Sequence, residues 1–146
     1  MILLDASLLV YAHDSSSPFH ERARSWVEER LNGPSRVGIP WPSILAFLRL
    51  TTNPRVARSP FTPVQAWGHV TTWLSSPAVW IPSPTDRHAE VLGRFVTSLQ
   101  LTAALVPDAH LAALATEHGL EICSADSDFA RFPGVRWSNP LAPEPS

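Results

Sequence analysis

Met1-Ile-Leu-Leu-Asp-Ala-Ser7 opens the chain with an apolar run that ends at an acid, Asp5. A similar pattern lies near the other end of the sequence, where Leu120-Glu-Ile-Cys-Ser124 comes just before Asp126. A short apolar run bounded by polar or turn residues is typical of a buried strand. The sequence therefore predicts two buried strands, each followed by an aspartate.

A third aspartate, Asp108, follows Leu105-Val-Pro107, which we interpret as another strand end, and opens the helical stretch Ala109–His118. The carboxyl ends of parallel strands share one edge of a sheet, and ligands bind in the crevice outside that edge. We therefore expect the three aspartates to converge at a single point, although they come from distant parts of the sequence.

The rest of the chain alternates between strand and helix signals. This alternation predicts an α/β/α sandwich, with a mostly parallel sheet of about four to five strands and helices on both faces. We expect one domain over residues 1–138, followed by a proline-rich C-terminal tail over residues 139–146. The expected strands are 2–4, 36–39, 79–81, 120–123 and 135–137, and the expected helices are 18–31, 44–51, 63–74, 85–99 and 108–118.

Carboxylates gathered without nearby cations repel one another, and a hard divalent cation relieves that repulsion. The pattern therefore predicts a Mg²⁺ site, with Mn²⁺ as an alternative ion. Each acid also has a purely structural interpretation. Asp108 would favour a helix start whatever the function, and Asp126 suits an Asx-turn. A structural role is hardest to assign to Asp5, because a carboxylate at the end of a buried strand is costly unless it is paired.

The composition is that of a globular domain, with 45% apolar and 16% charged residues among 146. No apolar run approaches the roughly 18 residues that a membrane span requires, and no signal peptide is evident. The single cysteine, Cys123, excludes an internal disulfide and is expected to be an inert core thiol. These features predict a cytoplasmic protein without a membrane partner.

All eleven basic residues are arginines, so mechanisms that need a lysine are excluded. These include P-loop nucleotide hydrolysis and phosphotransfer by receiver or haloacid-dehalogenase-like domains, which also place an aspartate after the first strand. The net charge of −2 argues against coating of nucleic acid by bulk charge, so phosphate contacts need a local arginine cluster. We expect these contacts from Arg49 and Arg87, with Arg55 and Arg131 as further candidates.

Four segments together resemble the PIN-domain ribonucleases, and in particular the VapC-like toxins of type II toxin–antitoxin systems. The opening Met1–Ser7 is similar to the first strand of that family. Pro107–Gly119 and Ser124–Phe129 are similar to its second and third acidic motifs, and Phe47–Arg55 resembles a stretch common in one branch of these toxins. The likeness covers nearly the whole chain, in the order and size that the family has.

This resemblance implies a divalent-metal-dependent endoribonuclease that hydrolyses phosphodiester bonds in RNA, with tRNA or rRNA as the expected substrate. It further implies a homodimer and a cognate VapB-like antitoxin that neutralises the toxin. Asp5 and Asp108 are the expected direct metal ligands, and Asp126 is expected to bind through water or to orient the nucleophile. Ser7 is expected to hydrogen-bond a ligand carboxylate or a metal-bound water.

One position departs from the family pattern. A glutamate is expected in the helix after the second strand, near Ala46, but the sequence has no acid between Glu29 and Asp86. Asp128 is then a candidate fourth carboxylate. The absence of this glutamate leaves an alternative function open, in which the chain is a catalytically weak PIN module that binds RNA or a partner protein.

The six tryptophans are relevant to whether the protein has an apolar surface for protein partners. Trp26, Trp67 and Trp73 fall on helices that would cover the sheet, and core packing is their simplest role. A contiguous exposed set of such residues would instead mark a protein interface.

Overall fold

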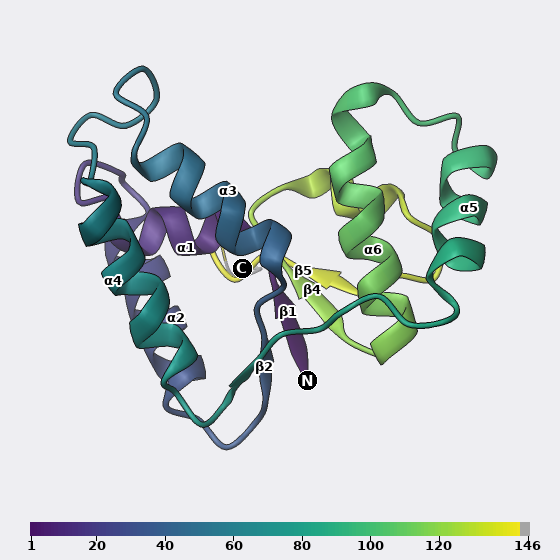
Figure 1. Ribbon diagram of the computed structural model, residues 1–146, viewed down its shortest axis with the longest axis horizontal. Helices are drawn as coiled ribbons and strands as arrows, with labels where there is room; N and C mark the ends of the chain where they lie inside the picture. Colours follow the sequence, from purple (N-terminus) through teal and green to yellow (C-terminus); the bar gives the residue numbers. More distant parts are fainter. Residues whose placement is uncertain (144–146) are drawn as a thin grey trace.

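The computed structural model describes residues 1–143, and these form a parallel sheet of five strands with helices on both faces (Figure 1). The strand order is β3-β2-β1-β4-β5, and all four strand pairs are parallel. The predicted fold class and parallel sheet are therefore confirmed. The strands are β1 (Ile2–Leu4), β2 (Val37–Gly38), β3 (Val79–Trp80), β4 (Glu121–Cys123) and β5 (Trp137–Ser138).

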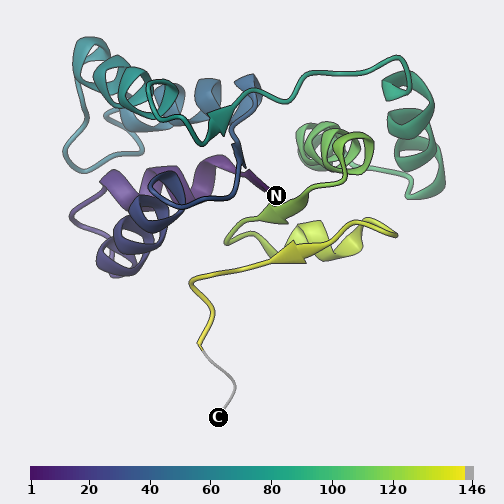
Figure 2. The same cartoon turned by 90° about the horizontal axis from the view of Figure 1, so that it is seen from below.

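The helices divide into two groups on opposite sides of the sheet (Figures 1 and 2). α1, α2, α3 and α4 cover one face, and α5 and α6 cover the other. Their bounds are α1 (Ala6–His13), α2 (His20–Leu31), α3 (Trp41–Thr51), α4 (Pro63–Leu74), α5 (His88–Ser98) and α6 (Val106–His118), with 3₁₀ turns η1 (Ala103–Leu105) and η2 (Ser127–Arg131).

Side chains of the central strands alternate between the two cores, as the two-residue period of a strand requires. Leu3 packs into the core under α5 and α6, whereas Leu4 packs into the core under α1 to α4. The neighbouring strand β4 does the same with Ile122 and Cys123. Burial raises the pKa of the Cys123 thiol to about 11, so the thiol is the inert core group that the sequence predicted.

The interpretation of residues 105–107 as a strand is wrong. Leu105 ends η1, and Val106 and Pro107 already belong to the first turn of α6. Proline fits that turn because its missing amide hydrogen would have no partner there. A short apolar run cannot be distinguished from a buried helix start by pattern alone. Asp108 therefore stands in the first turn of a helix and not at a strand end.

Two predicted helices also differ in detail. α2 begins at His20, because the Ser17 hydroxyl accepts from the Phe19 amide in a local turn and does not cap the helix. α4 begins with a Thr62 capping box, but it does not bury Trp67 as predicted. Its buried side chains are Ala66, Val70 and Trp73, while Trp67 is 45% exposed.

The rotation of α4 follows from one aromatic contact. The Trp73 ring packs edge-on against Phe47 of α3, with centroids 4.6 Å apart. This contact turns Trp67 and Val64 outward, and Val64 is 83% exposed. Core packing of Trp26 and Trp73 is confirmed, whereas core packing of Trp67 is wrong.

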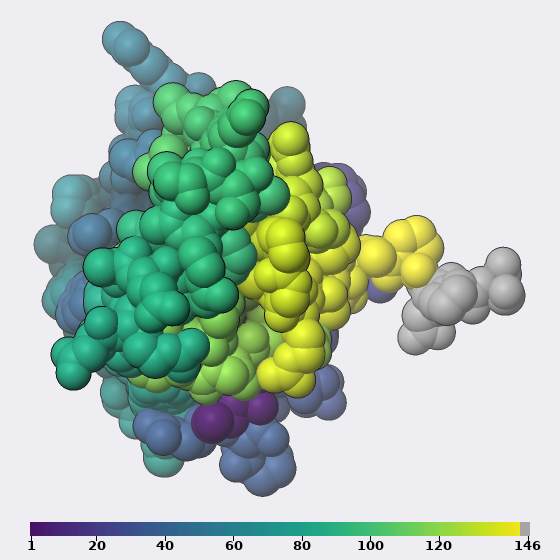
Figure 3. Space-filling model, turned by 90° about the vertical axis from the view of Figure 1, so that its right-hand side faces the viewer, coloured from purple at the N-terminus to yellow at the C-terminus, as the bar shows by residue number. Residues whose placement is uncertain are grey.

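The segment after β5 is tied to the domain before the described residues end. Leu141 is buried in the core under α1 to α4, and Arg22 donates to the Ala142 carbonyl at 3.2 Å. Figure 3 shows the chain around β5 in yellow beside the face that α5 covers, and the segment after β5 leading away from that face. The predicted tail thus starts as packed chain, and residues 144–146 lie outside the described residues. Over residues 1–143, no helix has the length and apolar character of a bilayer span.

Candidate metal centre

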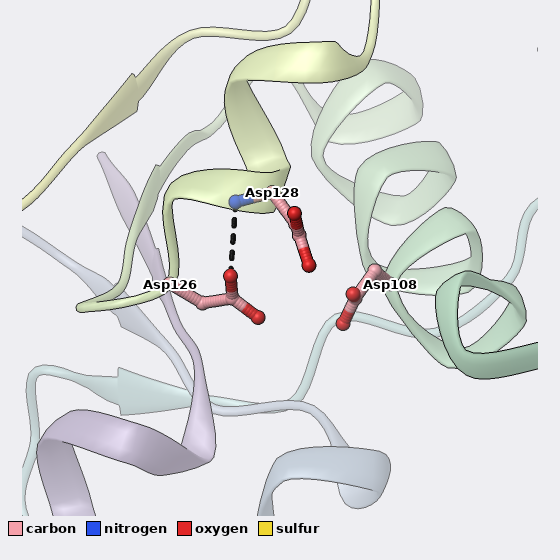
Figure 4. Close-up of side chains that lie close together, drawn as sticks. All are labelled: Asp108, Asp126 and Asp128. Carbon is pink, nitrogen blue, oxygen red and sulfur yellow. Dashed lines mark hydrogen bonds between the residues drawn. The ribbon is translucent and has the colours of Figure 1, made fainter.

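Three carboxylates converge at the carboxyl edge of the sheet. One oxygen from each of Asp108, Asp126 and Asp128 lies within 4.8 Å of the others. Figure 4 shows the three side chains pointing into the same space, Asp108 from α6 and the other two from the start of η2. The predicted convergence of Asp108 and Asp126 is therefore confirmed, and Asp128 joins them directly.

Local backbone geometry places Asp126 and Asp128. Asp126 is the N-cap of η2, and its Oδ1 accepts from the Asp128 amide at 2.9 Å. This is the turn role that the sequence offered as an alternative to metal binding. Because the cap uses only one of the two carboxylate oxygens, Oδ2 stays available for a ligand. The structural and functional interpretations of Asp126 are therefore compatible.

Asp5 borders this group without belonging to it. It follows β1 and is the N-cap residue of α1, but its side chain makes no capping hydrogen bond. Its Oδ2 instead accepts from the hydroxyl of Ser124 at 2.7 Å. The carboxylate that the sequence could least explain structurally is thus held by a hydroxyl from the end of β4.

The neighbouring acids make ionisation of Asp108 more costly. Burial raises the pKa of the Asp108 carboxyl to about 6, and the negative charges of Asp126 and Asp5 add to the rise. Asp128 adds a smaller contribution of the same sign. A divalent cation would relieve this repulsion, and carboxylate oxygens are the ligands that Mg²⁺ prefers. The donor set therefore fits a hard cation such as Mg²⁺ or Mn²⁺.

Comparison with known proteins places this geometry in a family. The family model described as "PIN domain" matches residues 2–135. The chain belongs to the PIN-domain family. It is 44% identical to Ribonuclease VapC37 of Mycobacterium tuberculosis over 142 residues, which are 97% of this chain and 99% of that relative. It is 37% identical over 141 residues to Ribonuclease VapC33 of the same species, again covering 97% and 99%.

Solved structures show the same PIN fold at lower sequence identity. VapBC2 from Rickettsia felis, bound to a DNA fragment from its promoter, matches with a TM-score of 0.70 at 15% identity, covering 95% of this chain and 98% of that one. The Mycobacterium tuberculosis toxin VapC20, described as cleaving the sarcin-ricin loop, matches with a TM-score of 0.65 at 18% identity, covering 93% and 99%. The resemblance to VapC-like PIN ribonucleases is confirmed.

A buried serine organises this PIN site, and sequence reasoning missed it. Ser124 is fully buried, donates to Asp5, and accepts from the Asp126 amide at 2.9 Å. Ser7 lies 3.3 Å from the Ser124 hydroxyl and accepts from the Ala125 amide at 3.2 Å. Ser7 therefore reaches Asp5 only through Ser124. The signal that could have found Ser124 is its place at the end of β4, two residues before Asp126.

The α3 side of the PIN site supplies no carboxylate. The Ser43 hydroxyl donates to the Leu4 carbonyl at 2.7 Å, which fixes the start of α3 against the end of β1, next to Asp5. Ala46, near which the family pattern has a glutamate, lies one turn further along α3 and is partly exposed. Among residues 1–143, the cluster of possible metal ligands consists of the three aspartates of α6 and η2.

The candidate phosphate-binding arginines are scattered. Arg131 Nη1 lies 3.8 Å from Asp128 Oδ1, so this side chain borders the acids. Arg49 and Arg55 are exposed in α3 and in the loop that follows it. Arg87 stands at the start of α5, where its neighbour Thr85 bonds to Glu117, roughly 13 Å along α6 from Asp108. The structure thus brings Arg131 to the acids and places the backbone of Arg87 well away from them.

Proposed function

We propose that this protein is a Mg²⁺-dependent endoribonuclease that acts as the toxin of a toxin–antitoxin pair. The observation that carries the proposal is the group of three carboxylate oxygens within 4.8 Å, in a chain 44% identical to Ribonuclease VapC37. On this proposal the enzyme hydrolyses phosphodiester bonds in cytoplasmic RNA, either tRNA or rRNA, and thereby inhibits translation or growth.

The geometry favours a different division of roles from the one that the sequence predicted. We assign Asp108, Asp126 and Asp128 as direct ligands, because their oxygens already lie close together. Asp5, held by Ser124, would act through a coordinated water. When bound, Mg²⁺ or Mn²⁺ lowers the pKa of a water and neutralises charge on the attacked phosphate.

The remaining steps fall to the side chains around the acids. Asp5 is fixed at one oxygen by Ser124, so its other oxygen can accept a hydrogen bond from the attacking water and orient it. Arg131, whose side chain is 64% exposed beside Asp128, can bind a phosphate oxygen of the substrate. Arg49 is proposed as a second phosphate contact and Arg87 as a more distant one.

Exposed apolar side chains support the partners that we propose. Trp41 and Leu45 are exposed on α3, and Val64 and Trp67 are exposed on α4. Large apolar groups on two neighbouring helices suit protein interfaces. We propose that they serve a homodimer and a VapB-like antitoxin that neutralises the enzyme.

The test is RNA cleavage by purified protein with Mg²⁺, with EDTA, and with the Asp108→Asn variant. We expect cleavage only with wild-type protein and metal, and mapping of cut sites after induced expression would identify the RNA. The second candidate function is a PIN module that binds RNA or a partner without efficient cleavage, which the alanine at position 46 favours. Binding of RNA that stays intact under all metal conditions would establish that second function.

A further inference from the structure

The charges of this chain are unevenly distributed along the sequence. Residues 30–85 contain five arginines and no aspartate or glutamate, whereas the rest of the chain carries six arginines and all thirteen acids. The acid-free segment includes β2, α3, α4 and β3. One part of a chain with net charge −2 is therefore strongly positive, which is the pattern that attracts a polyanion locally.

Over residues 1–143, three of the five arginines of this segment make no side-chain contact, and two of these three, Arg55 and Arg58, share one loop. Arg30 stacks over the Trp26 ring and Arg36 over the Trp80 ring, so both already contact aromatic side chains. Arg55 and Arg58 are exposed, and over residues 1–143 no hydrogen bond, ion pair or aromatic contact involves either guanidinium. Their charges are free to bind a ligand from solution.

The loop that carries these two arginines is ordered by its own hydrogen bonds. Asn53 Oδ1 accepts from the Arg55 amide, and the Asn53 carbonyl accepts from the amides of Val56 and Ala57, all at 2.9–3.0 Å. The Phe61 amide closes the loop by donating to the Thr51 carbonyl at 2.9 Å. The loop projects beyond α3 in Figure 1, and it is the blue projection at the upper edge of Figure 3. A fixed, protruding loop presents both charges at a low entropic cost on binding.

The distance from the acids sets what this loop can touch. α3 starts beside Asp5, where Ser43 bonds to the Leu4 carbonyl, and it ends at Thr51. Eight residues of helix place the loop about 12 Å beyond that start. This exceeds the roughly 3.4 Å rise per nucleotide of a stacked strand several times over. Arg55 and Arg58 therefore lie too far away to act on the phosphate at the acidic cluster.

We propose that Arg55 and Arg58 grip the RNA backbone several nucleotides from the bond that is cleaved. This contact between the two arginines and the RNA backbone, which we call the grip, adds a substrate-binding site to the proposed ribonuclease function and rests on that function. Arginine suits the task because its guanidinium binds phosphate in a bidentate manner and stays charged. The grip contributes to substrate binding at all RNA sequences alike, since phosphate contacts carry no base information. It makes no contribution to the chemical step.

The test measures KM and kcat for RNA cleavage across a range of salt concentrations. The substrate is an oligonucleotide of about 20 nucleotides, longer than the roughly 4–16 nucleotides that single-strand sites often cover. For the Arg55→Gln/Arg58→Gln double variant we expect the slope of log(1/KM) against log[salt] to flatten by about 1.4, because each lost phosphate contact removes about 0.7. The value of kcat should stay within about twofold, as expected when uniform binding is removed.

Two controls separate the grip from general charge and from folding. Arg94→Gln removes another exposed arginine, from α5 and outside the acid-free segment, and should leave the slope unchanged. Arg55→Lys/Arg58→Lys keeps the charge and should restore most of the slope. Thermal melts of all variants should coincide, because neither guanidinium supports the fold.

Each adverse outcome has a separate meaning. A wild-type slope in the double glutamine variant overturns the grip while leaving ribonuclease activity intact. A fall in kcat at constant KM also overturns it, since it would place these arginines in the chemistry. If the variant keeps the slope but escapes neutralisation by a co-expressed antitoxin, the loop is a protein contact instead. If wild-type protein cleaves no RNA, the proposed function fails, and the same salt series measured by fluorescence anisotropy still decides whether the loop binds RNA.

Discussion

The two sides of the sheet edge differ in charge although they flank the same site. On the side of α6 and η2, three aspartates place oxygens within 4.8 Å of one another. On the side of α3, Ser43 bonds to the backbone, and Ala46 lies near the position where a glutamate was expected. The acid-free segment continues from α3 into the loop with Arg55 and Arg58. The possible metal ligands therefore come from one side of the edge, and on our proposal the other side faces the substrate.

The largest effect should come from the acidic side. Asp108→Asn replaces one of the three clustered carboxylates with a neutral amide and removes one negative charge, while keeping the shape of the side chain. We expect RNA cleavage to fall on the order of 10²–10³-fold, the range for losing one electrostatic contributor to a transition state. The same variant should fold normally, because it relieves repulsion among carboxylates. A variant with full activity would remove Asp108 from the metal centre.

Ser124→Ala should give the next largest effect, because it removes the hydrogen bonds that hold Asp5 and Asp126 in place. The change removes the donor to Asp5 and the acceptor of the Asp126 amide, and both hydrogen bonds involve the buried Ser124 hydroxyl. We expect a loss of about 1–2 kcal/mol in the free energy of unfolding. Loss of a group that orients metal ligands should lower activity or metal affinity about 10–100-fold. Ser7→Ala is the matched control, because Ser7 reaches Asp5 only through Ser124, and its effect should be smaller.

The α3 side can be tested by adding the missing acid. Ala46→Glu places a carboxylate one turn after Ser43, which is fixed at the end of β1. We expect Mg²⁺ affinity to rise about tenfold, a change of about 1.4 kcal/mol, measured by titration calorimetry. Leu45→Glu introduces the same charge at the adjacent exposed position and should leave affinity unchanged. Equal effects of the two variants would show that only net charge matters.

The strands and the position of Asp108 could be predicted from the sequence, for physical reasons. The strands and their shared edge were predictable, because buried parallel strands are short apolar runs and their carboxyl ends meet. The position of Asp108 was predicted correctly from a wrong element, since Leu105–Pro107 is a helical start whose apolar run resembles a strand. A strand end and a helix start both put Asp108 at the carboxyl edge of the sheet, because a helix that leads back to the next parallel strand begins at that edge.

Features that depend on packing between distant segments were not predictable. The burial of Ser124 and its bond to Asp5 join residues that are 119 positions apart, and no local pattern encodes that contact. The exposure of Trp67 follows from the packing of Trp73 on Phe47, which sets the rotation of α4. The free guanidinium groups of Arg55 and Arg58 were likewise visible only after the contacts of the other arginines were known.

The smallest expected effect is a pH dependence of stability on the acidic side. The pKa of Asp108 rises from 3.8 to about 6 on folding, so the folded state binds this proton more tightly than the unfolded state. Without metal, the stability that this group contributes is present below about pH 4 and is lost as the pH rises to about 6. Because Asp108 is partly exposed, solvent screening limits the loss to about 1 kcal/mol. A change of this size shifts the melting temperature by roughly 2–4 °C.

Mg²⁺ should reverse this loss, because a carboxylate must be deprotonated to bind metal. We expect the gain in melting temperature on adding Mg²⁺ in place of EDTA to be larger above about pH 7 than below about pH 5. The Asp108→Asn variant, followed by the same melts, should lose most of the pH dependence between these values and most of the Mg²⁺ response. If instead Ala46→Glu raises the Mg²⁺ response while Asp108→Asn leaves it unchanged, metal binding would be centred on the α3 side, and the contrast between the two sides would be reversed.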